Sequence, residues 1–257
     1  MGSKSFDTFY FLLDKSLHSV AEVQREYEEM NGNLSRFKGF MFCPECKVAE
    51  LSFTRKTHLR REYLSKLPNS RHSFGCSYIH DYASNKEVIS FVKSLTHVQI
   101  QERLETALNL LCNKRVSSED KEHVNYYNPF VIPVKSKRGV NSICKTIRRK
   151  SINSWFDKDE CDQMYIFYGK VKLCVKGWSK VDGGIEKRFY KLMVYTLRKG
   201  VWKFKITVFR GGIRDDVDCE AVYDLAILGS IGFFGECPQI KTATLTSIKM
   251  RKIVLKK

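Results

Sequence analysis

The pattern of apolar and polar residues changes near residue 164. Before that point, apolar residues recur three or four positions apart in residues 5–30 and 84–113, which is the spacing of a helix with one buried face. After it, apolar and polar residues alternate one by one, as they do in half-buried strands. The pattern predicts an α+β protein with a helical N-terminal part and a β-rich C-terminal part.

The N-terminal part contains three predicted regions. Residues 5–30 are expected to form a helix or a helical pair that ends at the N-G-N sequence of residues 31–33. Residues 37–67 are expected to form short strands around a C-P-E-C turn. Residues 84–113 have the clearest helical pattern, with Ser84 in an N-cap position, and predict one long helix or two short ones.

The C-terminal part contains five predicted strands. Residues 165–177, 187–197 and 201–210 are separated by the turn sequences K-V-D-G-G and R-K-G. A helix is expected over residues 217–228, followed by strands over 230–240 and 242–255. Three strands, a helix and two strands is the order of an OB-fold, a five-stranded barrel that binds oligonucleotides.

Cys43 and Cys46 form a C-x2-C turn, and His72 and Cys76 form an H-x3-C pair further on. Two cysteines separated by two residues can direct both sulfurs at one centre, and a second N/S pair completes a tetrahedron. We therefore predict a structural Zn²⁺ site in a zinc-ribbon-like module, with His80 as the alternative to His72. Four protein ligands leave no open position for a catalytic water.

The predicted domains are a helical module with the zinc knuckle (1–128), a basic connecting segment (129–163) and an OB-fold-like barrel (164–257). The chain has 45 Lys and Arg against 28 Asp and Glu, a net charge of +17. Between Tyr165 and Lys257 the counts are 19 and 8, whereas between Met1 and Ser84 they are 12 and 10. The positive charge therefore belongs mainly to the predicted barrel, and it favours a polyanionic partner such as nucleic acid.

Strand alternation predicts which barrel residues face outward. Val171 and Leu173 belong to the inward set of one strand, and Trp202 and Phe204 to that of another. Lysines beside aromatic residues on the opposite faces suit a track for a phosphate backbone with stacked bases. The predicted nucleic-acid-binding residues are Tyr168, Lys170, Lys172, Lys176, Trp178, Phe189, Lys191, Lys203, Lys205 and Phe209, with Arg148 and Arg149 ahead of them.

Motifs of common enzyme classes are not found. The sequence has no phosphate-binding G-x4-G-K-[ST], no H-E-x-x-H and no G-x-S-x-G. A cluster of Asp157, Asp159, Glu160 and Asp162 is interpreted as a solvated turn, with a metal-dependent nuclease as the alternative.

No stretch has the ~18 consecutive apolar residues of a membrane span, so we expect no membrane partner. Nine unevenly spaced cysteines favour a reducing compartment, and we expect a cytoplasmic protein, or one located wherever its nucleic acid is.

Part of the barrel resembles a known family. The sequences I-L-G-S-I-G-F-F-G and T-L-T-S-I-K-M-R-K-I resemble the fourth and fifth strands of single-strand-binding OB-folds. Together with the Cys/His pattern, the chain resembles zinc-containing single-strand-binding proteins of replication and recombination. This resemblance implies a non-catalytic protein that binds single-stranded nucleic acid, DNA rather than RNA, in replication, recombination or a mobile-element or defence process. The alternative is a protein-interaction subunit of a larger nucleoprotein complex.

Overall fold

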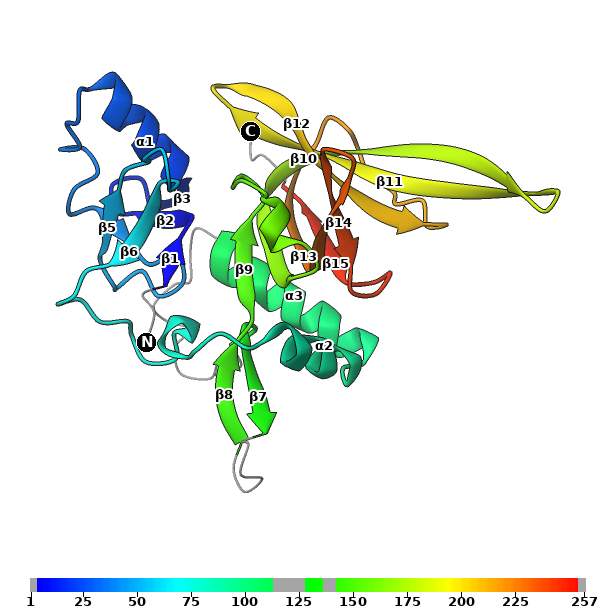
Figure 1. The fold of residues 1–257 in the computed structure, drawn as a ribbon, viewed down its shortest axis with the longest axis horizontal. Helices are drawn as coiled ribbons and strands as arrows, with labels where there is room; N and C mark the ends of the chain where they lie inside the picture. The colour runs from blue at the N-terminus through cyan, green and yellow to red at the C-terminus, as the bar shows by residue number, and fades with distance from the viewer. Residues whose placement is uncertain (1–3, 113–127, 136–141, 254–257) are drawn as a thin grey trace. The chain divides into compact units, whose positions relative to one another are not determined.

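The computed structural model describes residues 4–112, 128–135 and 142–253. The chain forms two compact units (Figure 1). Residues 1–81 and 110–146 form the first, called here the cysteine unit, and residues 82–109 and 147–257 form the second, the barrel unit. These bounds differ from the predicted ones, because residues 82–109 and 147–163 group with the barrel.

The cysteine unit is built from short elements. Its strands are β1 (Ser5–Phe6), β2 (Thr8–Phe11), β3 (Ser16–Ser19), β4 (Met41–Phe42), β5 (Leu51–Thr54), β6 (Tyr63–Lys66), β7 (Val131–Lys135) and β8 (Ser142–Thr146), with helix α1 (Val20–Glu29) and the 3₁₀ turn η1 (Ser77–Ile79). They form the sheets β1-β6-β5 and β3-β2-β4 and the hairpin β7-β8. A shared core of buried aromatic and aliphatic side chains includes Phe6, Phe9 and Leu64.

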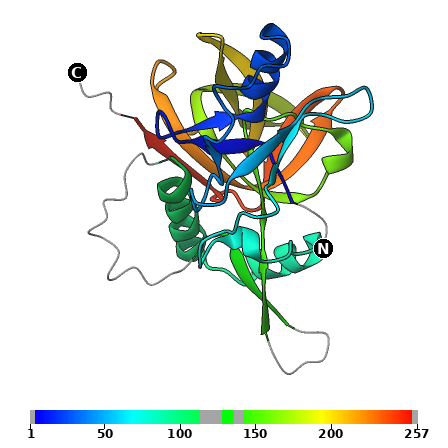
Figure 2. The same ribbon diagram turned by 90° about the vertical axis from the view of Figure 1, so that its left-hand side faces the viewer.

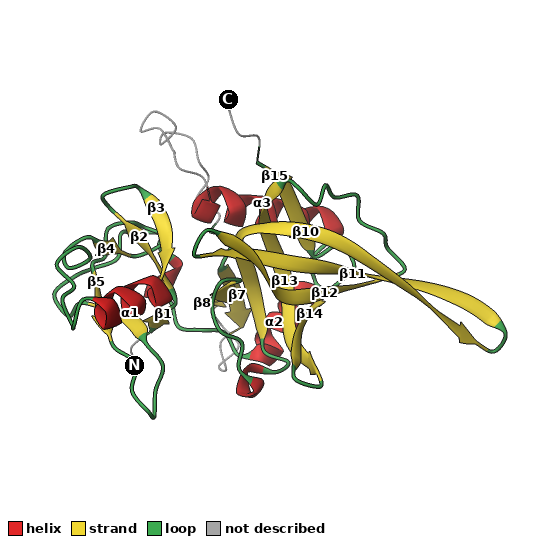
Figure 3. Ribbon diagram, turned by 90° about the horizontal axis from the view of Figure 1, so that it is seen from above, coloured by secondary structure: helices red, strands yellow, loops and turns green. Residues whose placement is uncertain are grey.

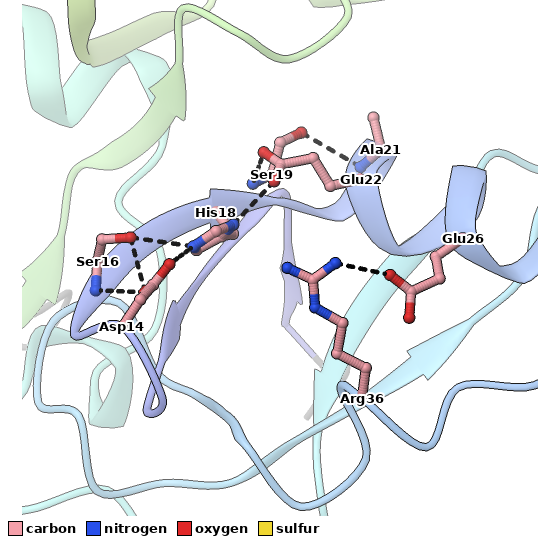
Figure 4. A network of polar contacts seen from close by, with 8 residues as sticks. All are labelled: Asp14, Ser16, His18, Ser19, Ala21, Glu22, Glu26 and Arg36. Carbon is pink, nitrogen blue, oxygen red and sulfur yellow. Dashed lines mark hydrogen bonds and ion pairs between the residues drawn. The ribbon is translucent and has the colours of Figure 1, made fainter. Parts of the chain in front are cut away.

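The predicted helix over residues 5–30 is wrong in its first half. Lys15 adopts a positive φ of 57°, and the Asp14 carboxylate accepts hydrogen bonds from the Ser16 backbone N–H (3.0 Å) and hydroxyl (2.8 Å). This side-chain-stabilised turn reverses the chain and joins β2 to β3. The helix begins only after Ser19, whose side chain caps it in a capping box with Glu22 (Figure 4).

The described residues of the barrel unit form helix α2 (Asn85–Lys93), most of helix α3 (His97–Cys112), the 3₁₀ turn η3 (Lys158–Glu160) and seven strands. The strands are β9 (Arg148–Ser151), β10 (Met164–Asp182), β11 (Ile185–Arg198), β12 (Val201–Gly211), β13 (Val222–Phe234), β14 (Cys237–Thr242) and β15 (Ile248–Lys252). Ser84 caps α2 as predicted, and the helical pattern forms two helices. Helix α3 lies beside β15, where Arg251 reaches Glu105 (3.2 Å) and Asn109 (2.7 Å) (Figure 2).

Five strands close into a barrel, which confirms the predicted number, but the fourth and fifth strands are not the predicted ones. The predicted strand over 230–240 contains the turn between β13 and β14, with Gly235 at a positive φ, and the predicted strand over 242–255 contains β15, which pairs with β13 outside the closed ring. The pairing runs β10-β11-β12-β14-β13 and returns from β13 to β10, with β12 and β14 parallel and the other neighbours antiparallel. A Cβ at Gly229 would lie closer than van der Waals contact to the carbonyl of Lys241, so only glycine allows β14 to approach there. The core of the barrel is mainly aliphatic and includes Val171, Leu192 and Ile227, with Phe167 among its aromatic members.

The predicted helix over residues 217–228 is wrong: most of this segment lies in β13. From Tyr223 to Gly229 every residue of this strand is buried. A strand that is buried on both faces shows no alternation, and its apolar run cannot be told from a buried helix by periodicity.

The long hairpin of β10 and β11 extends beyond the barrel (Figures 1 and 3). The first half of β10 pairs with β13 and the second half pairs with β11 as far as Asp182. Gly183 and Gly184, both at positive φ, form the turn. The outer part of this hairpin therefore has two solvent-exposed faces.

Candidate functional site

Two sets of side chains stand out, one in each unit. In the cysteine unit, the ligand atoms of Cys43, Cys46, His72 and Cys76 all lie within 4.8 Å of one another. Among the residues that the structure describes, this is the one Cys/His/Asp/Glu group that could hold a metal ion. The prediction that these four residues come together is confirmed, and His80 does not belong to the group.

Local backbone geometry positions the four ligands. After β4, the Lys47 N–H donates to the Cys43 carbonyl (2.9 Å), and Lys47 turns the chain at a positive φ of 57°. On the second segment, Gly75 has a φ of 82° and Cys76 N–H donates to the carbonyl of Ser73 (3.2 Å). Two tight turns thus present one pair of ligands each.

The ligand atoms are close enough to share one ion. The sulfurs of Cys43 and Cys76 are 3.9 Å apart, and Nδ1 of His72 lies 3.5 Å from the sulfur of Cys46 and 3.5 Å from that of Cys76. Contacts with the neighbouring thiols of Cys43 and Cys76 lower the pKa of Cys46, whereas burial raises the pKa of Cys43 to about 12. The protein alone thus opposes ionisation of its buried thiol, and a bound cation would remove this penalty.

A buried carboxylate next to the cluster connects its two segments through hydrogen bonds. Glu45, between the two knuckle cysteines, accepts hydrogen bonds from the Ser77 N–H (2.6 Å), the Ser77 hydroxyl (2.7 Å) and the Asn128 amide (2.6 Å). Asn128 also donates to the carbonyl of Gly75 (2.8 Å). Glu45 therefore joins the C-P-E-C turn to the segment that carries the other two ligands.

The second set lies on the outward face of the β10–β11 hairpin. Lys176 pairs with Lys191, Trp178 with Phe189 and Lys180 with Lys187 in the strand register. Two lysine pairs thus lie on either side of an aromatic pair. We call this group, with Phe209 of β12 beside it, the ladder; its members are Lys176, Trp178, Lys180, Lys187, Phe189, Lys191 and Phe209.

Ring contacts organise the centre of the ladder. Trp178 stacks on Phe189 with centroids 5.7 Å apart, and the ring of Phe209 is 6.3 Å away. The Lys191 ammonium lies 5.7 Å from the Trp178 centroid. Trp178 remains 41% exposed and Phe209 37% exposed, so aromatic surface is open to a ligand.

Several predicted binding residues lie outside the ladder. The prediction that Tyr168 points outward is wrong: it is 2% exposed and lies where β10 is paired on both sides, with β9 and with β13. Lys205 lies at a β-bulge, with its ammonium 5.5 Å from the Trp155 ring. The remaining residues lie elsewhere on the unit: Lys170 and Lys203 are exposed, and Lys172, Arg148 and Arg149 are half-buried.

The same bulge explains a second error. It shifts the register between Val194 and Tyr195, so that Phe204 faces Tyr195 and packs edge-on against it at 6.0 Å. Phe204 was predicted to point inward but is 46% exposed. One extra residue in a strand reverses the alternation beyond it, and sequence alone does not reveal where that residue lies.

Sequence reasoning missed Lys180 and Lys187. The K-V-D-G-G sequence was interpreted as a turn, whereas β10 continues to Asp182 and only the two glycines turn. The signal was present in the sequence, because Lys180 and Lys187 continue the parity of Lys176 and Lys191.

An acidic segment borders the ladder. Residues 215–220 read D-D-V-D-C-E, and Glu220 pairs with Lys172 of β10 at 3.0 Å. Cys219 forms a disulfide with Cys174, which lies between Lys172 and Lys176 on the same face of β10. A buried ion pair between Arg210 and Asp215 (2.7 Å) anchors the start of the segment.

The acidic residues 157–162 make structural contacts. Asp157 and Glu160 form a capping box around η3, and Glu160 also pairs with Lys150 at 2.6 Å. Their bonds support the interpretation of this cluster as a turn.

Comparison with known proteins adds no relatives: no protein family, curated protein or solved structure matches the chain. None of the helices that the structure describes is both long and apolar enough to cross a membrane.

Proposed function

We propose that this protein binds single-stranded nucleic acid, DNA in preference to RNA, without catalysing a reaction on it. The observation that carries the proposal is the ladder, in which the exposed Trp178 stacks on the half-buried Phe189 between two pairs of lysines. Every base has a flat face that can stack on an aromatic ring, and lysines can follow the phosphates without reading sequence.

The barrel supports this assignment through its strand order. Its first strand pairs with the second and fourth, and its third strand lies parallel to the fifth. This is the arrangement of an OB-fold, in which the second and third strands and the loop between the first and second strands bind oligonucleotides. The ladder occupies that region, since it runs from β12 across β11 to the β10–β11 hairpin.

The dimensions of the ladder suit an extended strand. Alternate residues on one face of a strand are about 6.8 Å apart, so the two lysine pairs are about 14 Å apart with the aromatic pair midway. A strand lying along the hairpin would meet positive charge, a stacking surface and positive charge in turn. The affinity should therefore fall steeply as salt rises.

For the cysteine unit we propose a structural Zn²⁺ ion. Tetrahedral zinc with Zn–S of about 2.3 Å and Zn–N of about 2.0–2.1 Å requires sulfurs about 3.8 Å apart and sulfur–nitrogen distances of about 3.6 Å. The observed sulfur–sulfur distance of 3.9 Å and the two sulfur–nitrogen distances of 3.5 Å fit these values. A Cys3His set supplies all four ligands, as structural sites do.

The test is a fluorescence anisotropy titration of labelled oligodeoxythymidylate at several salt concentrations. Trp178→Ala should weaken binding about 5- to 150-fold, the equivalent of the ~1–3 kcal/mol that one aromatic stack contributes. Trp155→Ala is the matched control, since Trp155 is an exposed tryptophan of the same unit outside the ladder. Equal effects of the two exchanges, or affinity that is independent of salt, would refute the proposal.

A further inference from the structure

The loop between β5 and β6, residues 55–61, is the most cationic surface of the cysteine unit's N-terminal stretch. It reads R-K-T-H-L-R-R, with four permanent positive charges and no acidic residue, and every position in it is exposed. Residues 1–84 together have 12 Lys and Arg against 10 Asp and Glu. The charge of this stretch is therefore concentrated at one place.

Hydrogen bonds hold this loop in one shape. Thr57 N–H donates to the Arg60 carbonyl (2.8 Å), and Arg60 N–H donates to the Thr57 hydroxyl (3.1 Å). At the base of the loop, Lys56 N–H donates to the side-chain carbonyl of Gln24 on α1 (2.9 Å). A loop whose charges serve only solubility needs no such order, whereas a preordered loop loses less conformational entropy when it binds a ligand.

Aromatic rings orient two of the guanidinium groups. Arg60 lies over the ring of Tyr63 at 4.0 Å, and Arg55 lies over Tyr27 at 5.9 Å while also donating to its hydroxyl (3.0 Å). Stacking uses the flat face of a guanidinium, whereas its N–H donors lie in the plane and point sideways. The donors of Arg60 are thus presented edge-on, the orientation in which arginine binds a phosphate with two hydrogen bonds.

We propose that the 55–61 loop is a second nucleic-acid contact, which binds backbone phosphates through Arg60 and Arg61. The proposal takes its class of ligand from the proposed function, but it concerns a different unit and different residues. The arginines of the loop would contact the sugar–phosphate backbone and no base edges. The loop should therefore add affinity and salt dependence to oligonucleotide binding without adding sequence preference.

The test uses the full chain, titrated with labelled oligodeoxythymidylate over a range of salt concentrations. Arg60→Ala/Arg61→Ala should lower the slope of log affinity against log salt by about 1.4, because each lost phosphate contact on a single strand removes about 0.7. Arg60→Lys/Arg61→Lys keeps the charges, so the slope should persist while the affinity falls with the loss of two-bond geometry.

The matched control is Lys38→Ala/Lys135→Ala, which removes two exposed cations of the same unit outside the loop. Unchanged circular dichroism and metal content in each variant show that the fold is intact. The proposal is overturned if the loop variant matches this control variant.

The outcomes separate the two proposals. If Trp178→Ala weakens binding and the loop variant does not, the ladder binds the oligonucleotide and the loop proposal fails. If the loop variant weakens binding and Trp178→Ala does not, the loop proposal holds and the ladder is not the binding surface. If the wild-type chain binds no oligonucleotide, both proposals fail. A membrane contact is the alternative to be tested, because Leu59 is 86% exposed within the loop. Sedimentation with phosphatidylserine vesicles that is lost in Leu59→Ala, without any change in oligonucleotide binding by the loop variant, would identify a membrane contact instead.

Discussion

Removal of the metal should destabilise the cysteine unit and spare the barrel unit. The four ligands come from two segments, around Cys43 and Cys46 and around His72 and Cys76, and the ion would join them. Without it, the structure keeps three sulfurs and one imidazole close together, and burial raises the pKa of the Cys43 thiol to about 12. Much of the stability of this unit should therefore come from the ion.

The size of the effect follows from binding linkage. A ligand present at 100 times its dissociation constant stabilises the folded state by about 2.7 kcal/mol, and at 1,000 times by about 4.1 kcal/mol. For a unit of somewhat more than 100 residues, each kcal/mol shifts the melting temperature by roughly 4 °C. Chelation should therefore lower the melting temperature of the cysteine unit by roughly 10–16 °C.

The assay is differential scanning calorimetry with and without a chelator, alongside metal analysis by mass spectrometry. We expect one transition to move down and a second, from the barrel unit, to stay in place. Cys43→Ala should reproduce the effect, and Cys144→Ala, at an exposed cysteine outside the cluster, should not. A chain that contains no metal as purified yet melts as it does with added zinc would refute the reasoning.

Three further predictions concern single residues. Glu45→Ala should lower metal affinity about 10- to 100-fold, measured by chelator competition, because the ligand segments lose their buried hydrogen-bond acceptor; unchanged affinity would argue against this supporting role. Glu220→Gln should strengthen oligonucleotide binding at low salt, since it frees Lys172 from its ion pair, and a weaker complex would contradict this. Burial opposes the charge of His18, but its bonds to Glu22 and the neighbouring Asp14 outweigh burial and raise the pKa of His18 above 6.5 (Figure 4). A histidine with a raised pKa stabilises the fold at pH values below its unfolded pKa, and this contribution is lost as the pH rises through its folded pKa. The difference in unfolding free energy between the wild type and His18→Gln should therefore fall above about pH 6.5. A difference that does not change with pH would refute the assignment.

The candidate sites were predictable where the chemistry is local in sequence. The C-x2-C and H-x3-C spacings identified all four residues of the Cys3His cluster, because each pair is set by one tight turn. Alternation along β10 and β11 identified Lys176, Trp178, Phe189 and Lys191, because the face of a strand residue follows from its parity. Neither inference required a long-range contact.

The errors occur where distant parts of the chain decide the outcome. Tyr168 is buried in the part of β10 that pairs with β9, a strand that ends more than ten residues before β10 begins. The burial of β13 on both faces likewise depends on segments that are distant in the sequence. The position of Phe204 depends on a bulge in the pairing of β11 with β12. The local pattern of apolar and polar residues does not indicate which other strand a given strand will pair with.

The amino-acid sequence by itself thus determined the members of the Cys3His cluster, the cationic character of the barrel and the parity of the ladder, since spacing, charge and alternation are properties of neighbouring residues. The tertiary structure alone decided that β13 and β14 are the fourth and fifth strands of the closed barrel, and that the β10–β11 hairpin extends the ladder to Lys180 and Lys187. It also decided that an acidic segment pairs with Lys172 of β10. These features arise from strand pairing between residues far apart in the chain, whose energy depends on the whole arrangement of the barrel and not on any one segment.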